Sequence, residues 1–324
     1  MATTTFAHTR GVQDSNAQQV WRAYEAIMRK RYPGVENMVG AQFWGTNELA
    51  TTGLHNEVLY HTGLLGSAAK LGRDLRTPVP MATYETVDQV VADYEILGIG
   101  FEYYPDELED FLYPETVLDK LGDLPILLAD AEEDEHFAPY NNGETLTGGW
   151  TGMRMFVDGS GAQHLQIIGR PGENYGSNII DTAGGPSYHL ISLVEQYGHN
   201  FVNEEGRISP LRVDRVMCSR QNKRLLDLYY GAPYNIEQGK EAIPNPADSR
   251  PEVIATHRLA NPNDMIFFFE GWDEDLKERS KWRGQALTET VGNLNEKRVV
   301  SIIRSRYAYY WFFNRRVLLV KGSA

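Results

Sequence analysis

The segment Leu59 to Tyr104 constrains the fold most, because it predicts a long excursion of the chain with too few apolar residues for a core of its own. Leu59 to Asp74 contains several glycines and two basic residues, which is typical of a mobile loop. Val87 to Tyr104 is rich in β-branched and aromatic residues and predicts one strand or two, bent near Gly98 or Gly100. Because a two-stranded hairpin is only marginally stable alone, something else must support this excursion, and a neighbouring subunit is one candidate.

The composition is that of an ordinary globular protein and excludes several classes. The 324 residues suffice for one large domain or two modest ones. Cys218 is the only cysteine, so a disulfide within one chain is excluded. No stretch approaches the roughly 18 consecutive apolar residues of a membrane span, and Met1 to Arg10 lacks the pattern of a signal peptide. We expect a soluble protein, made in the cytosol, that does not bind a membrane.

The net charge of −13 bears on nucleic acid. Binding through bulk attraction requires Lys and Arg to neutralise phosphates, so this chain is not expected to bind nucleic acid in that way. It could still face nucleic acid without adhering to it. The simpler interpretation is that the acidic balance keeps the protein soluble.

The spacing of apolar residues predicts four helices. They run from about Asp14 or Ser15 to Arg31, from Asp106 to His136, from Ser187 to Phe201, and from Ser219 to Tyr230. Trp21 and Tyr24 lie on the apolar face of the first helix, which packs within the subunit or on a neighbouring one.

The second predicted helix, Asp106 to His136, has two features of its own. Its apolar stripe comprises Leu112, Val117, Leu118, Leu121, Leu124, Leu127 and Leu128. Pro114 and Pro125 are expected to kink or divide it, because proline removes a backbone donor and clashes with the preceding turn. The acidic run Ala131 to Glu135 is interpreted as a solvated helix end.

The last third of the sequence is mainly β, and no strand is predicted between Trp272 and Lys297. We find no internal repeat and no linker that separates two independent domains. The predicted strands are Arg212 to Met217, Val253 to His257, Met265 to Glu270, Arg298 to Ser305, Tyr307 to Phe313 and Arg316 to Val320.

Signatures of catalysis are missing from the sequence. There is no phosphate-binding GxxxxGK[ST] loop, no GxSxG turn and no HExxH pair. The eight histidines are scattered, which gives no support to a zinc site built from neighbouring residues. A carbohydrate-active enzyme remains an alternative, because Asp273, Glu274 and Asp275 lie beside Trp272 and Trp282, and carboxylates with stacking aromatics are the tools of that chemistry.

The order of elements in the second half resembles the major capsid proteins of tailed bacteriophages. The helix Tyr188 to Tyr197 precedes the strand-to-helix unit Arg212 to Gly231, which is followed by Pro251 to Ala260 and Met265 to Trp272. The ending is the most telling part. In Lys297 to Gly322, a basic, aromatic strand is followed by Asn314-Arg315-Arg316 and an apolar strand, similar to the usual end of that family.

The resemblance implies an α+β protein with the tailed-phage major capsid fold, which the herpesvirus capsid floor and encapsulin nanocompartments share. Its implied parts are an N-terminal arm with a helix, an extended loop, a peripheral domain with a long spine helix, an axial domain with a central mixed sheet, and closing strands common to both domains. In this order they occupy residues 1–58, 59–104, 105–185, 186–296 and 297–324.

The implied function is structural, without catalysis, cofactor or metal. The subunit would self-assemble through hexamers and pentamers into the icosahedral head of a tailed phage, enclose double-stranded DNA without sequence-specific binding, and reside in the virion. A portal, a scaffold and decoration proteins are the implied partners. We expect no built-in scaffolding segment and no lysine–asparagine cross-link. Candidate contacts between subunits are Trp21, Tyr24, Arg73, Asp74 and Arg76; simple surface solubility is the alternative for the two arginines.

Two further classes stay open. An encapsulin-like nanocompartment shell would share the fold but carry a cargo enzyme. A head-completion or tail component of a phage would be structural with a different fold.

Overall fold

The computed structural model describes residues 26, 30–32, 38–46, 56–65, 83–103, 114–148, 153–158, 177–182, 185–201, 208–232, 247, 250–291 and 298–322. The chain divides into two compact units. The first comprises Met1–Asn56, Asp93–His136 and Glu278–Tyr309. The second comprises Glu57–Ala92, Phe137–Lys277 and Tyr310–Ala324.

A four-stranded sheet organises the first unit, in the order β1-β9-β10-β4. β4 pairs antiparallel with β10, and Ile99 lies opposite Ile303. No strand was predicted in the region after Trp272, which contains β9, a strand of 16 residues. The two strands predicted between Arg298 and Phe313 form one, β10. The bounds are β1 Gly45–Thr46, β4 Glu95–Tyr103, β9 Leu276–Val291 and β10 Arg298–Trp311.

The long helix α3 (Pro114–Asn141) departs from its prediction in the middle and at its C-terminal end, and the predicted residues 106–113 lie outside the described residues. It continues through Pro125 without a break, so the expected division does not occur. It also extends past His136, so the acidic run Ala131 to Glu135 is not at its end.

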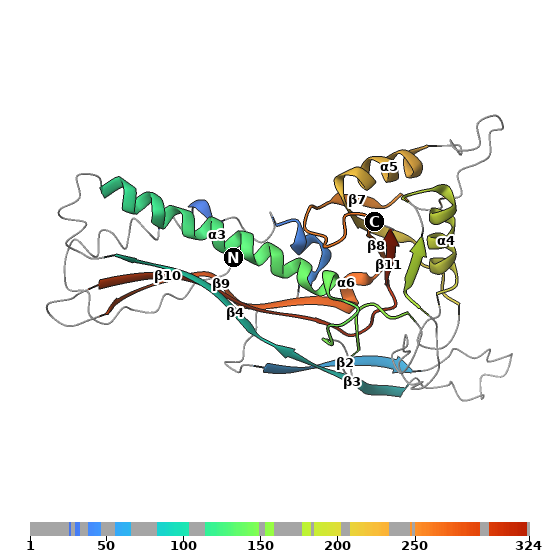
Figure 1. Cartoon of the computed structure of the whole chain (residues 1–324). Coiled ribbons are helices and arrows are strands. Elements are labelled where there is room, and N and C mark those ends of the chain that lie inside the picture. Colours follow the sequence, from blue (N-terminus) through green and yellow to red (C-terminus); the bar gives the residue numbers. More distant parts are fainter. Residues whose placement is uncertain are drawn as a thin grey trace. The chain divides into compact units, whose positions relative to one another are not determined.

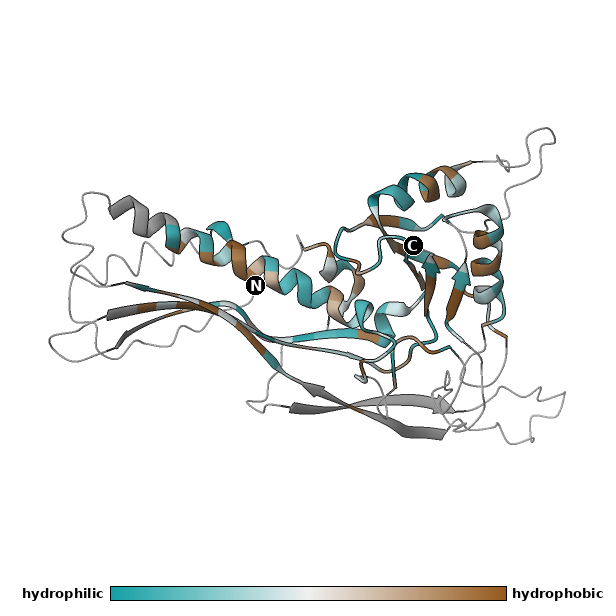
Figure 2. Ribbon diagram, viewed as in Figure 1, coloured by the Kyte–Doolittle hydropathy of each residue, from teal (hydrophilic) through white to brown (hydrophobic). Residues whose placement is uncertain are grey.

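α3 packs on the four-stranded sheet with one face (Figure 1). Leu121, Leu124 and Leu128 are buried against Ala286 of β9 and Ile303 of β10. Their spacing of three and four residues is that of one helix face. Leu127, which the predicted stripe included, is instead 51% exposed. α3 alternates hydrophilic and hydrophobic residues (Figure 2), and no described helix is long and apolar enough to cross a membrane.

The excursion predicted from Leu59 contains paired strands. β2 (Asn56–Leu65) and β3 (Thr83–Asp93) form a two-stranded sheet, so the loop predicted over Leu59 to Asp74 is wrong for residues 59–65. The chain breaks at Tyr94 between β3 and β4, not at Gly98 or Gly100. These two glycines lie within β4, where an added Cβ would come within 3.3 Å of Arg304 Cβ and 3.2 Å of Ile302 Cγ1 respectively.

The second unit contains a five-stranded mixed sheet in the order β5-β11-β8-β6-β7. β11 is parallel to β5 and antiparallel to β8, and β6 is antiparallel to β8 and parallel to β7. The central strand β8 has the sequence MIFFF, and all five residues are buried. A continuous apolar run of this kind suits a strand covered on both faces. The bounds are β5 Ile179–Thr182, β6 Val213–Cys218, β7 Glu252–Ala255, β8 Met265–Phe269 and β11 Val317–Gly322.

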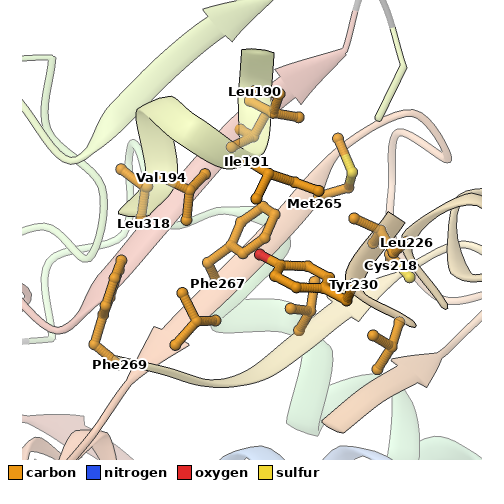
Figure 3. Close-up of a cluster of buried hydrophobic side chains, with 14 residues drawn as sticks. Leu190, Ile191, Val194, Cys218, Leu226, Tyr230, Met265, Phe267, Phe269 and Leu318 are labelled. Atoms are coloured by element: carbon orange, nitrogen blue, oxygen red, sulfur yellow. The ribbon is translucent and has the colours of Figure 1, made fainter. Parts of the chain in front are cut away.

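Two helices cover one face of this sheet. α4 (Tyr188–His199) follows Ser187 and α5 (Arg220–Gly231) follows Ser219, and each serine side chain accepts a backbone N–H, which is the role of an N-cap. Phe267 of β8 lies at the centre of the core, beside Tyr230 of α5 (Figure 3). Cys218 is fully buried there. The prediction of an α+β fold with mixed sheets is confirmed.

Candidate functional site

The five residues predicted from the sequence to form contacts between subunits lie outside the described residues. Trp21 and Tyr24 belong to the first predicted helix, and Arg73, Asp74 and Arg76 belong to the segment between β2 and β3. Their roles stay predictions.

The acidic cluster that suggested sugar chemistry is engaged in structural contacts. The four-residue helix α6 (Trp272–Asp275) follows Gly271, and the Arg316 guanidinium reaches both ends of it. Arg316 Nη1 donates to the Gly271 carbonyl at 2.7 Å and lies 3.2 Å from Glu274 Oε2, and Arg316 Nε is 3.6 Å from Asp275 Oδ2. Two of the three carboxylates are therefore paired with one cation.

Trp272 is likewise unsuited to stacking on a sugar. Its side chain is 5% exposed, and its Nε1 donates to Asp214 Oδ2 at 2.9 Å. Its ring packs edge-on against Phe268 and below the Arg215 guanidinium. Within the described residues, no group of three or more His, Cys, Asp and Glu side chains could hold a metal ion.

The first unit buries a set of charged side chains between α3 and its sheet. Glu132 and His136, one helical turn apart on α3, meet Glu278 and Arg283 of β9. Arg283 Nη1 lies 3.6 Å from Glu132 Oε2, and Arg283 Nη2 contacts Glu278 Oε1. The Tyr32 hydroxyl donates to Glu132 Oε2. One guanidinium thus neutralises two carboxylates that have almost no access to water.

His136 belongs to this network as a neutral ring. Its Nδ1 lies 2.6 Å from the Glu132 carbonyl, the position of a donor. Burial, followed by the nearby Arg283 guanidinium, lowers the pKa of His136 to about 4. Glu278 Oε2 is 3.5 Å from His136 Nε2, but Arg283 already balances that carboxylate, so it does not hold a proton on the ring.

This network was not predicted from the sequence. The interpretation of Ala131 to Glu135 as a solvated helix end was wrong for Glu132 and Glu133. Glu132 is fully buried, and Glu133 accepts the Gly40 N–H at 2.8 Å. The available signal was the spacing of Glu132 and His136, which places both on the same helix face as Leu121, Leu124 and Leu128.

The neutral His136 predicts a loss of stability in acid. The folded pKa lies below the unfolded value of about 6.5, so the unfolded chain gains a proton first, and stability falls as the pH drops from about 6.5 towards 4. At pH 5 this difference in protonation lowers the free energy of unfolding by on the order of 2 kcal/mol. Urea unfolding at pH 7 and pH 5 should therefore show a smaller pH effect for His136→Asn than for the unmodified protein. The matched variant His257→Asn, at an exposed site, should keep the full effect; equal pH effects in all three proteins would contradict the assignment.

In the second unit a single amide connects three segments. Asn178 is fully buried just before β5, and its Oδ1 accepts the Val157 N–H at 2.7 Å. Its Nδ2 lies 2.8 Å from the Met155 carbonyl, 2.9 Å from that of Asn314 and 3.0 Å from that of Val317. Asn314 belongs to the Asn-Arg-Arg break that the sequence singled out, so this break is fixed from inside the unit.

Several large apolar side chains stay exposed on the described surface. Ile96 of β4 is 55% exposed, Ile126 and Leu127 of α3 are 51% exposed, and Leu228 of α5 is 51% exposed. Each lies on the side of its element that faces away from the core. Only Ile126 and Leu127 are adjacent in the chain, and single exposed apolar side chains are normal on a protein surface.

No protein-family model matches the sequence, and no curated protein matches it. Among solved structures, a chain from Mycobacterium phage Patience aligns over 98% of this chain and 91% of its own, with a TM-score of 0.53 and 10% sequence identity. The capsid of a native GTA particle aligns over 100% and 96%, with a TM-score of 0.47 and 12% identity. A virus-like particle from Pyrococcus furiosus aligns over 94% and 98%, with a TM-score of 0.44 and 10% identity.

This chain has the HK97-like capsid fold. The resemblance to tailed-phage capsid proteins, which rested on the order of elements, is thereby confirmed at the level of the fold. Within this HK97-like fold, the Arg283 network lies in the first unit and the Asn178 contacts lie in the second.

Proposed function

We propose that this protein is a non-enzymatic shell subunit, the major capsid protein of a tailed bacteriophage. The observation that carries the proposal is the HK97-like fold, which extends over 98% of the chain. In this proposal the subunit forms hexamers and pentamers of an icosahedral head and encloses double-stranded DNA in the virion. A portal, a scaffold and decoration proteins are its proposed partners.

Two further observations support a structural role. Glu274 and Asp275 are held by Arg316 and Trp272 is buried, so these three residues do not form an open sugar-binding site. β2 and β3 form a sheet of two strands only, an arrangement that needs support from elsewhere.

Electron microscopy of the purified protein tests the proposal. We expect closed shells of uniform diameter after negative staining. A monodisperse monomer of 36.7 kDa at high concentration would overturn it, and hydrolysis of a glycoside by that monomer would favour the enzymatic alternative. Nuclease-protected DNA inside particles from the native host supports a phage head. A packaged cargo protein in place of DNA supports the nanocompartment.

The segment between β2 and β3 is proposed to reach a neighbouring subunit, through Arg73, Asp74 and Arg76. Deletion of residues 64–78 should leave a folded subunit that no longer assembles, because the segment that would reach a neighbour is lost. The four-stranded and five-stranded sheets are untouched, and β2 loses only its last two residues. Circular dichroism checks folding, and sedimentation velocity checks assembly. Replacement of residues 66–76 by a glycine-serine segment of equal length is the control that separates the loss of these side chains from the loss of length. Normal shells from the deletion variant would contradict the proposal.

A further inference from the structure

The turn that follows α3 contains the one Asn-Gly pair of the sequence, Asn142-Gly143. The helical hydrogen bonding of α3 extends to this pair, because the N–H of its asparagine donates to the Ala138 carbonyl at 2.9 Å. The carbonyl of the same asparagine accepts the N–H groups of Thr145 at 2.9 Å and Leu146 at 2.8 Å, which closes the turn. Both residues of the pair are therefore held in defined positions within the second unit.

Packing requires glycine at position 143. Gly143 is buried, and its carbonyl accepts the Phe156 N–H at 2.9 Å. A Cβ added there would lie 2.5 Å from Phe156 Cδ2 and 2.9 Å from the Pro139 carbonyl oxygen, so a larger residue does not fit while the ring and the helix stay in place. Glycine has a second property that matters here, since a residue without a side chain leaves its own N–H the least obstructed.

The two groups of this pair that can react with each other are both free. Asn142 is exposed, and its side-chain amide forms no hydrogen bond with any residue that the structure describes. The N–H of Gly143, unlike that of Asn142, donates to none of the described carbonyls. Asparagine is among the thermally labile residues, and a peptide nitrogen that is free to attack the amide carbon is what its loss of ammonia requires.

We propose that Asn142 is a site of spontaneous deamidation, which converts it through a cyclic imide into aspartate and isoaspartate. The Gly143 nitrogen loses its proton to water and attacks Cγ of Asn142. The new C–N bond closes the imide ring, the bond from Cγ to Nδ2 breaks, and Nδ2 takes up a proton and leaves as ammonia. Water then opens the ring. Cleavage at Cγ gives aspartate, and cleavage at the main-chain carbonyl carbon gives isoaspartate; nothing is oxidised or reduced.

The preceding residue, Asn141, provides a comparison within the same turn. It is exposed as well, but its Nδ2 donates to the Arg258 carbonyl at 2.9 Å and its Oδ1 accepts the Ala260 N–H at 2.9 Å. The nitrogen that would attack it is that of Asn142, whose N–H is bound to the Ala138 carbonyl. Of these two adjacent asparagines, only the second has both reacting groups free.

Conversion loosens the turn and accumulates with the age of the molecule. Isoaspartate carries the main chain through the former side chain, which adds a methylene between residue 142 and Gly143 and moves the carbonyl that holds Thr145 and Leu146. Either product also adds a negative charge two residues before Glu144, whose Oε2 lies 2.6 Å from Lys321 Nζ of β11. This inference does not rest on the proposed function, since the reaction needs neither a shell nor a partner.

The test follows the purified full-length protein during incubation at neutral and mildly alkaline pH. Trypsin releases residues 121–154 as one peptide that contains both Asn141 and Asn142, and tandem mass spectrometry measures conversion at each. A sample digested without incubation gives the conversion that digestion itself causes. We expect conversion at Asn142 to be at least tenfold faster than at Asn141. It should yield isoaspartate together with aspartate and accelerate with pH, because the attacking nitrogen must lose its proton.

The same chain unfolded in guanidinium chloride supplies the reference rate. A folded rate within tenfold of this reference supports the proposal. A folded rate more than tenfold slower would show that the turn protects Asn142 and would overturn it. Equal conversion of Asn141 and Asn142 would overturn it too, as would aspartate without isoaspartate, because direct hydrolysis does not pass through the imide.

Asn142→Gln is the matched variant for the consequence of the reaction. Its longer side chain closes a larger ring and should stay unconverted, and the fresh variant should be as stable as the unmodified protein because Asn142 is exposed. After incubation the unmodified protein should unfold at a lower temperature than before, and Asn142→Gln should not. Equal losses in the two proteins would contradict the loosening of the turn by conversion of Asn142.

Discussion

Replacing Arg283 by methionine should lower the free energy of unfolding by roughly 3–5 kcal/mol. The substitution leaves Glu132 and Glu278, both almost fully buried, without the guanidinium that contacts each of them. Breaking a buried ion pair on one side costs more than the pair contributes, because the remaining charge cannot be hydrated. Urea unfolding at pH 7 measures the change. A second readout is His136, whose pKa should rise because the Arg283 guanidinium is one of the causes that lower it.

The matched control is Arg31→Met. Arg31 Nη1 lies 3.8 Å from Asp123 Oδ1 at the surface, so its loss should cost less than about 1 kcal/mol. The triple variant with Arg283→Met, Glu132→Gln and Glu278→Gln should recover part of the stability, because it removes the unpaired charges. Equal losses for Arg283→Met and Arg31→Met would contradict the view that burial sets the cost.

Asn178→Asp should destabilise the second unit at least as strongly as Asn178→Ala, and both by roughly 3–5 kcal/mol. Asparagine donates with one end and accepts with the other, and the site requires both, since three carbonyl oxygens surround Nδ2 while the Val157 N–H faces Oδ1. Alanine leaves these backbone groups unpaired in the interior. Aspartate has the same shape but points a carboxylate oxygen at the three carbonyls.

Thermal unfolding of both variants checks this order. The exposed Asn200, at the C-cap of α4, provides the same two substitutions outside the core, and these should change stability by less than about 0.5 kcal/mol. If Asn178→Asp kept the stability of the unmodified protein, the N–H groups of Asn178 would not contribute to stability. That result would contradict the role inferred from the contacts of Nδ2.

Local sequence signals sufficed for α4, α5, β6, β7, β8 and β11 of the second unit, but they predicted no strand at β5 and a loop where residues 59–65 of β2 lie. Ser187 and Ser219 precede clear helical spacing, and both proved to be N-caps. The apolar run that begins at Met265 was predicted as a strand. All five residues of β8 are buried, so the prediction did not need to distinguish a buried face from an exposed one. The order of helices and strands along the chain was the basis of the resemblance to tailed-phage capsid proteins, which is confirmed at the level of the fold.

The first unit could not be predicted in the same way, because its core contains charges. β9 has the sequence LKERSKWRGQALTETV, which alternates poorly and has few apolar residues. Glu278 and Arg283 point inward only because each finds a partner on α3 or on β9 itself, and no local pattern encodes that match. The contacts that would define a functional surface are made with a second copy, and the sequence of one copy does not show which residues of the two copies meet.

The bend predicted near Gly98 or Gly100 was wrong because strand pairing, which the local sequence does not show, decides the role of these glycines. Gly98 and Gly100 suggested a bend, but each lies in β4 opposite a β10 residue whose side chain comes within 3.3 Å of the missing Cβ. Glycine there permits close approach of neighbouring side chains, while the change of strand partner occurs at Tyr94. A glycine within a strand pattern has both meanings, and pairing decides between them.

The position of β11 sets the order in which the second unit can be completed. β11 is the last of the five strands to leave the ribosome, yet it lies between β5 and β8, and β5 pairs with it alone. Residues 179–182 must therefore wait for residues 317–322, which are synthesised well over a hundred residues later. Until then the long-range pairing that closes the sheet is not available. Before residues 317–322 have been made, a subunit cannot present the finished five-stranded sheet to a growing assembly.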